Sequence, residues 1–186
     1  MGKRAGVRII GGTHRGRRLK VPAGVEVRPT ADRIRETLFN WLAPRLVGAR
    51  CLDLFAGSGA LGLEAASRGA GEVVLVEQAP KVAQMLEEHI QLLGLEHVKL
   101  HRAEALNWLD QGGEPFDLVF LDPPFRALLL PALFSRLSAK HWLSPGALLY
   151  FELPVHGELP ALPPSWSLYR DQRAGQVRYG LIQRTA

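Results

Sequence analysis

Apolar and polar positions change their period several times along this chain, and each change predicts the boundary of an element. Continuous apolar runs are typical of strands buried on both faces, whereas apolar residues at helical spacing predict helices. We therefore predict strands over residues 51–56, 72–77, 98–101, 116–121 and 147–153, and helices over 31–42, from Gly59 onward, over 80–93 and near Glu104. Pro44 and Gly48 are expected to end the first helix. The alternation of strands and helices indicates an α/β fold.

The two ends of the chain carry a different pattern. Residues 7–21 hold two short strand-like pieces around a basic connection that contains glycine. They predict a β-hairpin in which Ile9, Ile10, Leu19 and Val21 cover one another while the arginines stay exposed. Near the other end, residues 166–170 and 176–183 predict an antiparallel pair that closes the sheet.

A glycine-rich turn lies between the first predicted strand and the helix that follows it. Gly57, Gly59 and Gly62 match the pattern G-x-G-x-x-G, in which glycines allow a tight turn, close approach of a ligand and close packing of helix on strand. The same glycines are also explained by a plain strand-to-helix turn. The motif alone therefore leaves both interpretations open.

Acidic residues lie at or just after the carboxyl ends of three predicted strands. An acid at Asp53 repels phosphate and attracts ammonium, which favours a nucleoside with an amine and no phosphate, such as S-adenosylmethionine. Glu77 lies about 20 residues after the glycines, where a ribose-binding carboxylate is expected. Glu104 is placed to accept the amino proton of an adenine, or else to cap the next helix.

The tetrad Asp122-Pro123-Pro124-Phe125 directly follows the strand predicted over 116–121. Two prolines stiffen the loop and leave the carbonyl of Pro123 available as an acceptor. An acid, a carbonyl and an aromatic ring together can hold a planar base by its exocyclic amine and stack on its face. The alternative is a simple turn after the strand.

Composition indicates one folded domain with an uneven charge. The 186 residues are 47% apolar and carry a net charge of +5. Residues 1–35 hold ten Lys and Arg against two acids, so this part carries +8 and the remainder −3. Such asymmetry favours a nucleic-acid-binding segment, with Arg8, Arg15, Arg17 and Arg18 as candidate phosphate contacts, over a solvated basic tail.

The composition also limits the location and the chemistry. No apolar run approaches the roughly 20 residues that a membrane helix needs, and the N-terminus lacks the apolar core of a signal peptide. A single cysteine, Cys51, and the lack of a His/Cys cluster predict neither a disulfide nor a metal site. We therefore expect a cytoplasmic protein with no membrane and no metal partner.

Five blocks of sequence together resemble one known family, RsmD. They are R-I-I-G-G-x-x-R-G-R from Arg8, R-P-T-x-D-R-x-R-E-T-L-F-N-W-L from Arg28, D-L-F-A-G-S-G-A-L-G-L-E-A from Asp53, D-P-P-F from Asp122 and A-G-Q-V-x-Y from Ala174. Members of that family are bacterial enzymes that methylate N2 of a guanine in 16S ribosomal RNA. The resemblance spans nearly the whole chain.

The resemblance implies a Rossmann-like class I methyltransferase fold. The expected sheet has seven mostly parallel strands with an antiparallel C-terminal strand, preceded by a basic RNA-binding hairpin extension over 1–27, with the methyltransferase domain over 28–186. S-adenosylmethionine would lie in a crevice formed by Asp53, Phe55, Gly57, Gly59, Glu77, Glu104 and Ala105. The guanine would enter between this cofactor and the catalytic Asp122, Pro123 and Phe125. The partner would be 16S ribosomal RNA within a partly or fully assembled small subunit.

Two other classes of function also fit parts of the sequence. A DNA adenine-N6 or protein glutamine methyltransferase presents a similar planar amine to such a tetrad, although the basic hairpin favours RNA. A non-catalytic RNA-binding or ribosome-assembly factor could retain a nucleotide pocket. The presence of Asp53, Gly57, Glu77 and Asp122 weighs against this second alternative.

Overall fold

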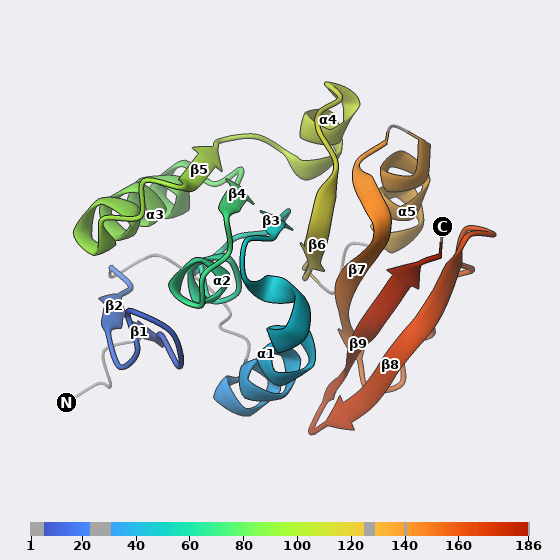
Figure 1. The fold of residues 1–186 in the computed structure, drawn as a ribbon, viewed down its shortest axis with the longest axis horizontal. Coiled ribbons are helices and arrows are strands. Elements are labelled where there is room, and N and C mark those ends of the chain that lie inside the picture. The colour runs from blue at the N-terminus through green and yellow to red at the C-terminus, as the bar shows by residue number, and fades with distance from the viewer. Residues whose placement is uncertain (1–5, 23–30, 125–128, 140, 186) are drawn as a thin grey trace.

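The computed structural model describes residues 6–22, 31–124, 129–139 and 141–185 (Figure 1). The elements in chain order are β1 (Gly6–Arg8), β2 (Arg18–Lys20), α1 (Asp32–Leu46), β3 (Arg50–Asp53), α2 (Gly62–Ser67), β4 (Glu72–Val76), α3 (Pro80–Leu93), β5 (Val98–His101), α4 (Ala105–Asp110), β6 (Phe116–Leu121), α5 (Leu130–Ala139), β7 (Leu143–Pro154), β8 (Trp166–Ala174) and β9 (Val177–Arg184). Within these residues, no helix has the length and apolar character needed to cross a membrane.

A seven-stranded sheet in the order β5-β4-β3-β6-β7-β9-β8 organises the molecule. Strands β3 to β7 are parallel to their neighbours, whereas β9 runs antiparallel to both β7 and β8. The predicted α/β class, with a mostly parallel sheet and an antiparallel C-terminal strand, is therefore confirmed.

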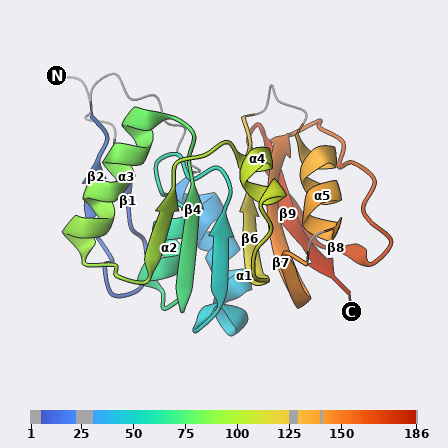
Figure 2. The same cartoon turned by 90° about the horizontal axis from the view of Figure 1, so that it is seen from above.

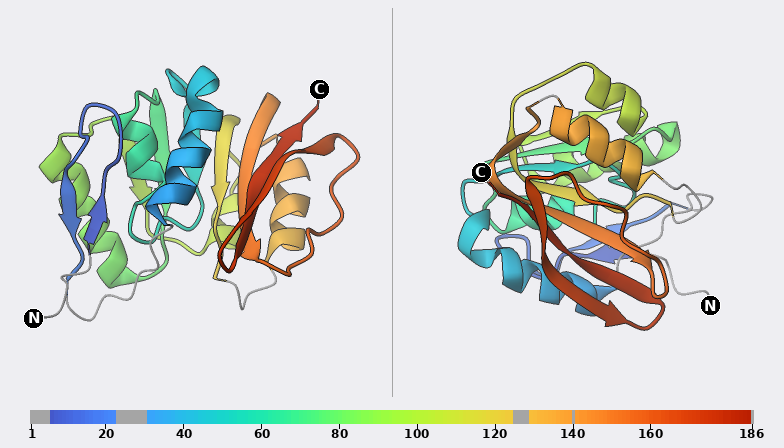
Figure 3. Two further views of the ribbon diagram at one scale, coloured as in Figure 1. Left: turned by 90° about the horizontal axis from the view of Figure 1, so that it is seen from below. Right: turned by 90° about the vertical axis from the view of Figure 1, so that its right-hand side faces the viewer.

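Helices cover both faces of the sheet, so its central strands are buried on both sides. Cys51 and Leu75 pack with α1, α2 and α3, while their neighbours Leu52 and Val74 pack with α4 and α5. Figure 2 shows α4 and α5 on the near side of the sheet, and the left view of Figure 3 shows α1 and the hairpin on the opposite side. This two-sided burial explains the nearly continuous apolar runs.

One predicted helix start was wrong, and of the two predicted stop signals for the first helix Gly48 was right and Pro44 was not. The helix after the glycine-rich turn begins at Gly62 rather than Gly59, because Gly57 and Gly59 have φ angles of 51° and 78° that a right-handed helix does not allow. The first helix runs through Pro44 and ends at Leu46. Pro44 lies in its last turn, where the missing N–H leaves only the carbonyl of the exposed Asn40 without a helical partner.

The predicted hairpin forms, but it is docked on the main body of the protein. β1 and β2 pair antiparallel, with Val7 opposite Leu19. Ile9 and Leu19 belong to the same core as α1, so the apolar residues cover the body as well as one another. The hairpin also reaches α3 (Figure 1), through His14 Nε2 at 2.9 Å from the carbonyl of Leu93. The predicted boundary between residues 27 and 28 lies outside the described residues.

One buried carboxylate, that of Glu64 on α2, joins the hairpin to two helices. It accepts hydrogen bonds from the backbone N–H groups of Ile10 and Gly11, both at 2.8 Å, and from Arg68 Nε at 2.7 Å. Arg35 Nη1 on α1 lies 3.4 Å away, and both side chains of this pair are at most 1% exposed. A buried ion pair is stable only when further hydrogen bonds satisfy both charges, as they do for Glu64.

We predict that Glu64→Gln lowers the free energy of unfolding by about 1–3 kcal/mol, because a neutral amide cannot accept from all of the N–H groups around Glu64 and Arg35 keeps only its ion pair of 2.6 Å with Asp32. Urea denaturation of both proteins measures the change. Glu87→Gln on the exposed face of α3 is the matched control and should change stability by less than about 0.5 kcal/mol. A loss below about 1 kcal/mol for Glu64→Gln would show that the network does not stabilise the fold.

Candidate functional site

The order of the strands places a crevice between β3 and β6. From β3 the chain proceeds outward through β4 and β5, then returns to place β6 on the other side of β3. In open α/β sheets, ligands bind outside the carboxyl ends of the strands at such a reversal. The loops that begin after Asp53 and Leu121 leave the sheet at this point, so the glycine-rich turn and residues Asp122–Pro124 lie at the carboxyl ends of two paired strands.

The glycine-rich turn is held by the acid that precedes it. Asp53 Oδ2 accepts a hydrogen bond of 3.0 Å from the backbone N–H of Gly62, the first residue of α2. A side chain at Gly62 would place its Cβ 2.2 Å from Leu75 Cδ2, so only glycine allows this close approach of helix and strand. Asp53 Oδ1 is buried without a hydrogen-bond partner, which suits a ligand that brings N–H donors.

Burial governs the ionisation of Asp53. The residue is 1% exposed, and this loss of solvation raises the pKa of its carboxyl to about 7. The backbone N–H groups of Gly62 and Phe55 oppose the increase in pKa, and the charge of Glu77 adds to it. A positively charged ligand group near Asp53 would lower this pKa and stabilise the carboxylate.

Glu77 and Glu104 both bind backbone N–H groups at the carboxyl edge of the sheet. Glu77 Oε2 accepts from Gly57 at 3.0 Å and Oε1 from Ala79 at 2.8 Å, so this carboxylate ties the glycine-rich turn to the end of β4. Glu104 caps α4 by accepting from Leu106 at 3.1 Å and Asn107 at 2.9 Å. The capping interpretation of Glu104 is therefore confirmed, and its contact with an adenine stays a prediction.

The Asp122 loop adjoins a second acid that the sequence analysis did not identify. Phe120 and Leu121 of β6 lie opposite Tyr150 and Phe151 of β7, and one further step of this register places Asp122 opposite Glu152. Glu152 is 3% exposed and accepts a hydrogen bond of 2.7 Å from the Tyr150 hydroxyl.

The pKa of the Tyr150 hydroxyl is affected by both of these acids. Burial raises the pKa of its hydroxyl well above its usual value, and the charges of Glu152 and Asp122 raise this pKa further. An acid near the end of an apolar strand, as at Asp53, is the signal that could have identified Glu152.

The structure gathers most of the predicted site residues into two groups. Around the crevice it places Asp53, Phe55, Gly57, Gly59, Glu77, Glu104, Ala105, Asp122 and Pro123, at the ends of β3, β4, β5 and β6 and in the loops that follow them. Phe125 lies outside the described residues. Arg8, Arg15, Arg17 and Arg18 form a separate exposed group on the hairpin. No cluster of His, Cys, Asp or Glu within the described ranges has the arrangement of a metal site.

The sheet order, the glycine-rich turn and the acids at the strand ends define a Rossmann-like class I methyltransferase fold. A family model described as Conserved hypothetical protein 95 matches residues 7–183. The chain belongs to this family, the same group that the sequence motifs identify as RsmD.

Named relatives and solved structures agree with this assignment. The chain is 49% identical over 180 residues to the ribosomal RNA small subunit methyltransferase D of Escherichia coli strain K12, covering 97% of this chain and 91% of the relative. It is 43% identical to the protein of the same name from Haemophilus influenzae, covering 95% and 93%. A solved structure described as putative methyltransferase yhhF from Escherichia coli has a TM-score of 0.91 and 47% identity, covering 98% and 99% of the two chains.

We predict that the Asp53 carboxyl makes stability depend on pH. Its pKa of about 7 in the folded chain lies above the ordinary value of 3.8, so the folded state binds the proton more tightly. Stability is therefore lost as the pH rises from about 4 to about 7, by up to about 4 kcal/mol. Asp53→Asn removes this loss, so the variant should gain stability relative to the parent between about pH 5 and about pH 8. Urea unfolding at both pH values measures the gain, and a constant difference between the two proteins would contradict the assignment.

Proposed function

We propose that this chain transfers a methyl group from S-adenosylmethionine to the exocyclic N2 amine of a guanine in 16S ribosomal RNA. The observation that carries the proposal is that Asp122 and Pro123 directly follow β6, the strand paired with β3, which leads into the glycine-rich turn. Membership of the family supports methylation of ribosomal RNA with this cofactor. A ribosomal substrate places the reaction in the cytoplasm.

The residues of the glycine-rich turn fit this cofactor. The unpartnered Oδ1 of Asp53 accepts an N–H donor, and Glu77 at the end of β4 is placed to bind ribose hydroxyls. Between these two acids, the cofactor would lie against Phe55, Gly57 and Gly59. Its adenine would lie beside Glu104 and Ala105. When bound, the cofactor supplies a methyl group on a positively charged sulfur, which is already a strong electrophile.

The protein then has to orient the amine and stabilise its developing charge. The lone pair of N2 is delocalised into the guanine ring, so the free amine is a weak nucleophile. Asp122 and the carbonyl of Pro123 accept hydrogen bonds from its two N–H groups, which favours a pyramidal nitrogen with the lone pair directed at the methyl group. The bound cofactor would supply the methyl group and keep the electron pair of the broken sulfur–carbon bond, while the nitrogen would give one proton to Asp122 or to water. Phe125 stacks on the base.

The hairpin within residues 1–27 binds the RNA. Its exposed Arg8, Arg15, Arg17 and Arg18 suit phosphate oxygens, which position an RNA without reading its sequence. We propose that the RNA is presented within a partly or fully assembled small subunit. Methylation of duplex DNA, or binding of ribosomal RNA without cofactor binding, would instead identify the chain as a DNA adenine methyltransferase or an assembly factor.

We predict that Asp122→Ala lowers the rate of methyl transfer to unmodified small subunits by about 100- to 1000-fold, because one preorganised contact to the amine is lost. Single-turnover transfer gives the rate, and calorimetry should show unchanged affinity for S-adenosylmethionine. Asp171→Ala on the exposed β8 is the control and should keep the parent rate. Undiminished transfer by a folded Asp122→Ala protein would exclude this mechanism.

We predict that replacing Arg15, Arg17 and Arg18 together by Ala weakens RNA binding without changing cofactor affinity. If these side chains neutralise phosphates, the slope of log affinity against log salt should shrink by up to about 3 on duplex-like RNA. Titrations at several salt concentrations measure the slope. An unchanged slope would show that these arginines do not contact phosphates and are only solvated surface residues.

A further inference from the structure

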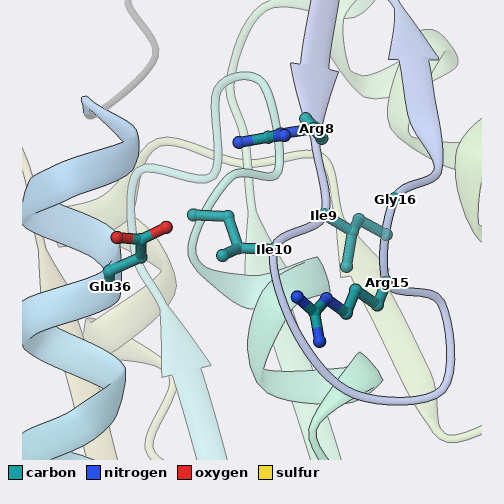
Figure 4. Close-up of a pocket in the computed structure, with 6 residues that line it drawn as sticks. All are labelled: Arg8, Ile9, Ile10, Arg15, Gly16 and Glu36. Carbon is teal, nitrogen blue, oxygen red and sulfur yellow. The ribbon is translucent and has the colours of Figure 1, made fainter.

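A pocket lies between the hairpin and helix α1, apart from the crevice at the strand ends. Its lining residues are Arg8, Ile9, Ile10, Arg15, Gly16 and Glu36, and its volume is about 110 Å³. Figure 4 shows the guanidinium groups of Arg8 and Arg15 and the carboxylate of Glu36 arranged around the side chain of Ile10. This volume is below the range of pockets that enclose a whole ligand, so the pocket can hold only one planar group of a ligand whose remainder lies outside it.

The direction of α1 relates this pocket to the crevice. α1 ends at Leu46 and β3 begins at Arg50, so the helix runs back antiparallel to the strand through a short connection. The first turns of α1, which include Asp32 and Glu36, therefore lie toward the carboxyl edge of the sheet. A strand of RNA on the hairpin could pass this pocket on its way to the Asp122 loop.

The pocket is lined by both positively and negatively charged side chains. Arg8 is held by an ion pair of 3.0 Å with Asp32, which fixes its guanidinium while other N–H groups stay available. Arg15 is exposed on the other side of the hairpin loop. Two guanidinium groups suit a phosphate, but a site for phosphate alone would not include the carboxylate of Glu36, which repels it.

A nucleotide satisfies all of these groups at once. The side chain of Ile10, which is partly exposed, offers an apolar surface for the base. Guanine presents two adjacent N–H donors, N1–H and N2–H, that one carboxylate can accept together, whereas adenine and cytosine pair one donor with an acceptor. Uracil places its single N–H between two carbonyl oxygens that repel a carboxylate. RNA is commonly read through such edges of unpaired bases.

From these observations we infer that the pocket between the hairpin and α1 binds one unpaired guanine nucleotide of the RNA, distinct from the guanine that is methylated. Glu36 accepts its two N–H groups, Ile10 supports the ring, and Arg8 and Arg15 bind the adjoining phosphates. The inference rests on the proposed binding of RNA by the hairpin.

Stem–loop RNAs with one bulged nucleotide test this inference, in four versions that differ only in the bulged base. Fluorescence anisotropy should show that the protein binds the guanine version about fivefold to tenfold more tightly than the other three, as expected for hydrogen bonds to a charged acceptor. Glu36→Ala should abolish this ratio. The loss of one negative charge can raise affinity for all four probes, so the ratio rather than the affinity is the measure.

Three control variants separate the pocket from other sites. Glu87→Ala removes an exposed acid on α3 and should keep the guanine preference. Arg17→Ala should weaken binding to all four probes equally. Asp122→Ala should also keep the preference, because the catalytic loop does not line this pocket.

Equal affinity of the parent protein for the four probes, or a preference that survives Glu36→Ala, would overturn the pocket assignment. Methyl transfer to small subunits is measured on the same preparations. Intact transfer in either of those cases would leave the proposed function standing and remove only the pocket. Absence of both transfer and binding to any probe would overturn the proposed function and the pocket with it.

Discussion

The carboxylate of Glu64 is the interaction on which the arrangement of the N-terminal half depends. It is buried in the core face of α2 and is surrounded by N–H donors from the hairpin, from α1 and from α2 itself. Arg35 extends the network to the carbonyl oxygens of Arg8 and Ala60. Because Ala60 lies in the glycine-rich turn, one charge pair fixes the hairpin relative to the loop that borders the crevice.

The two aspartates beside the crevice end neighbouring strands but have different surroundings. Asp53 is buried under α2, and its carboxyl is used to hold the start of that helix. Asp122 is only partly buried, in a loop stiffened by Pro123 and Pro124. Two carboxyl groups at neighbouring strand ends thus differ in solvation, one fully buried and one partly exposed. Glu104 also holds the start of a helix, because both of its oxygens accept hydrogen bonds from backbone N–H groups of α4.

Most of the helices and strands could be predicted from the local spacing of apolar and polar residues, whereas the contacts between residues far apart in the sequence could not. The bounds of α3 and β6 agree with the sequence prediction because their apolar spacing is regular and their ends carry strong local signals. The contacts of Glu64 with Ile10 and Arg35 were missed because they join residues 54 and 29 positions apart. The Tyr150–Glu152 pair was missed for a related reason, since its position beside Asp122 depends on the register of two separate strands.

The docking of the hairpin has a consequence for the order of events during protein synthesis. Ile10 is anchored on Glu64, and His14 reaches the carbonyl of Leu93, which is 79 positions further along the chain. A chain made from its N-terminus emerges with the arginine-rich segment long before these anchors exist. That segment can reach its final position only after α2 and α3 have been translated, so the hairpin completes its fold later than its place in the sequence would suggest.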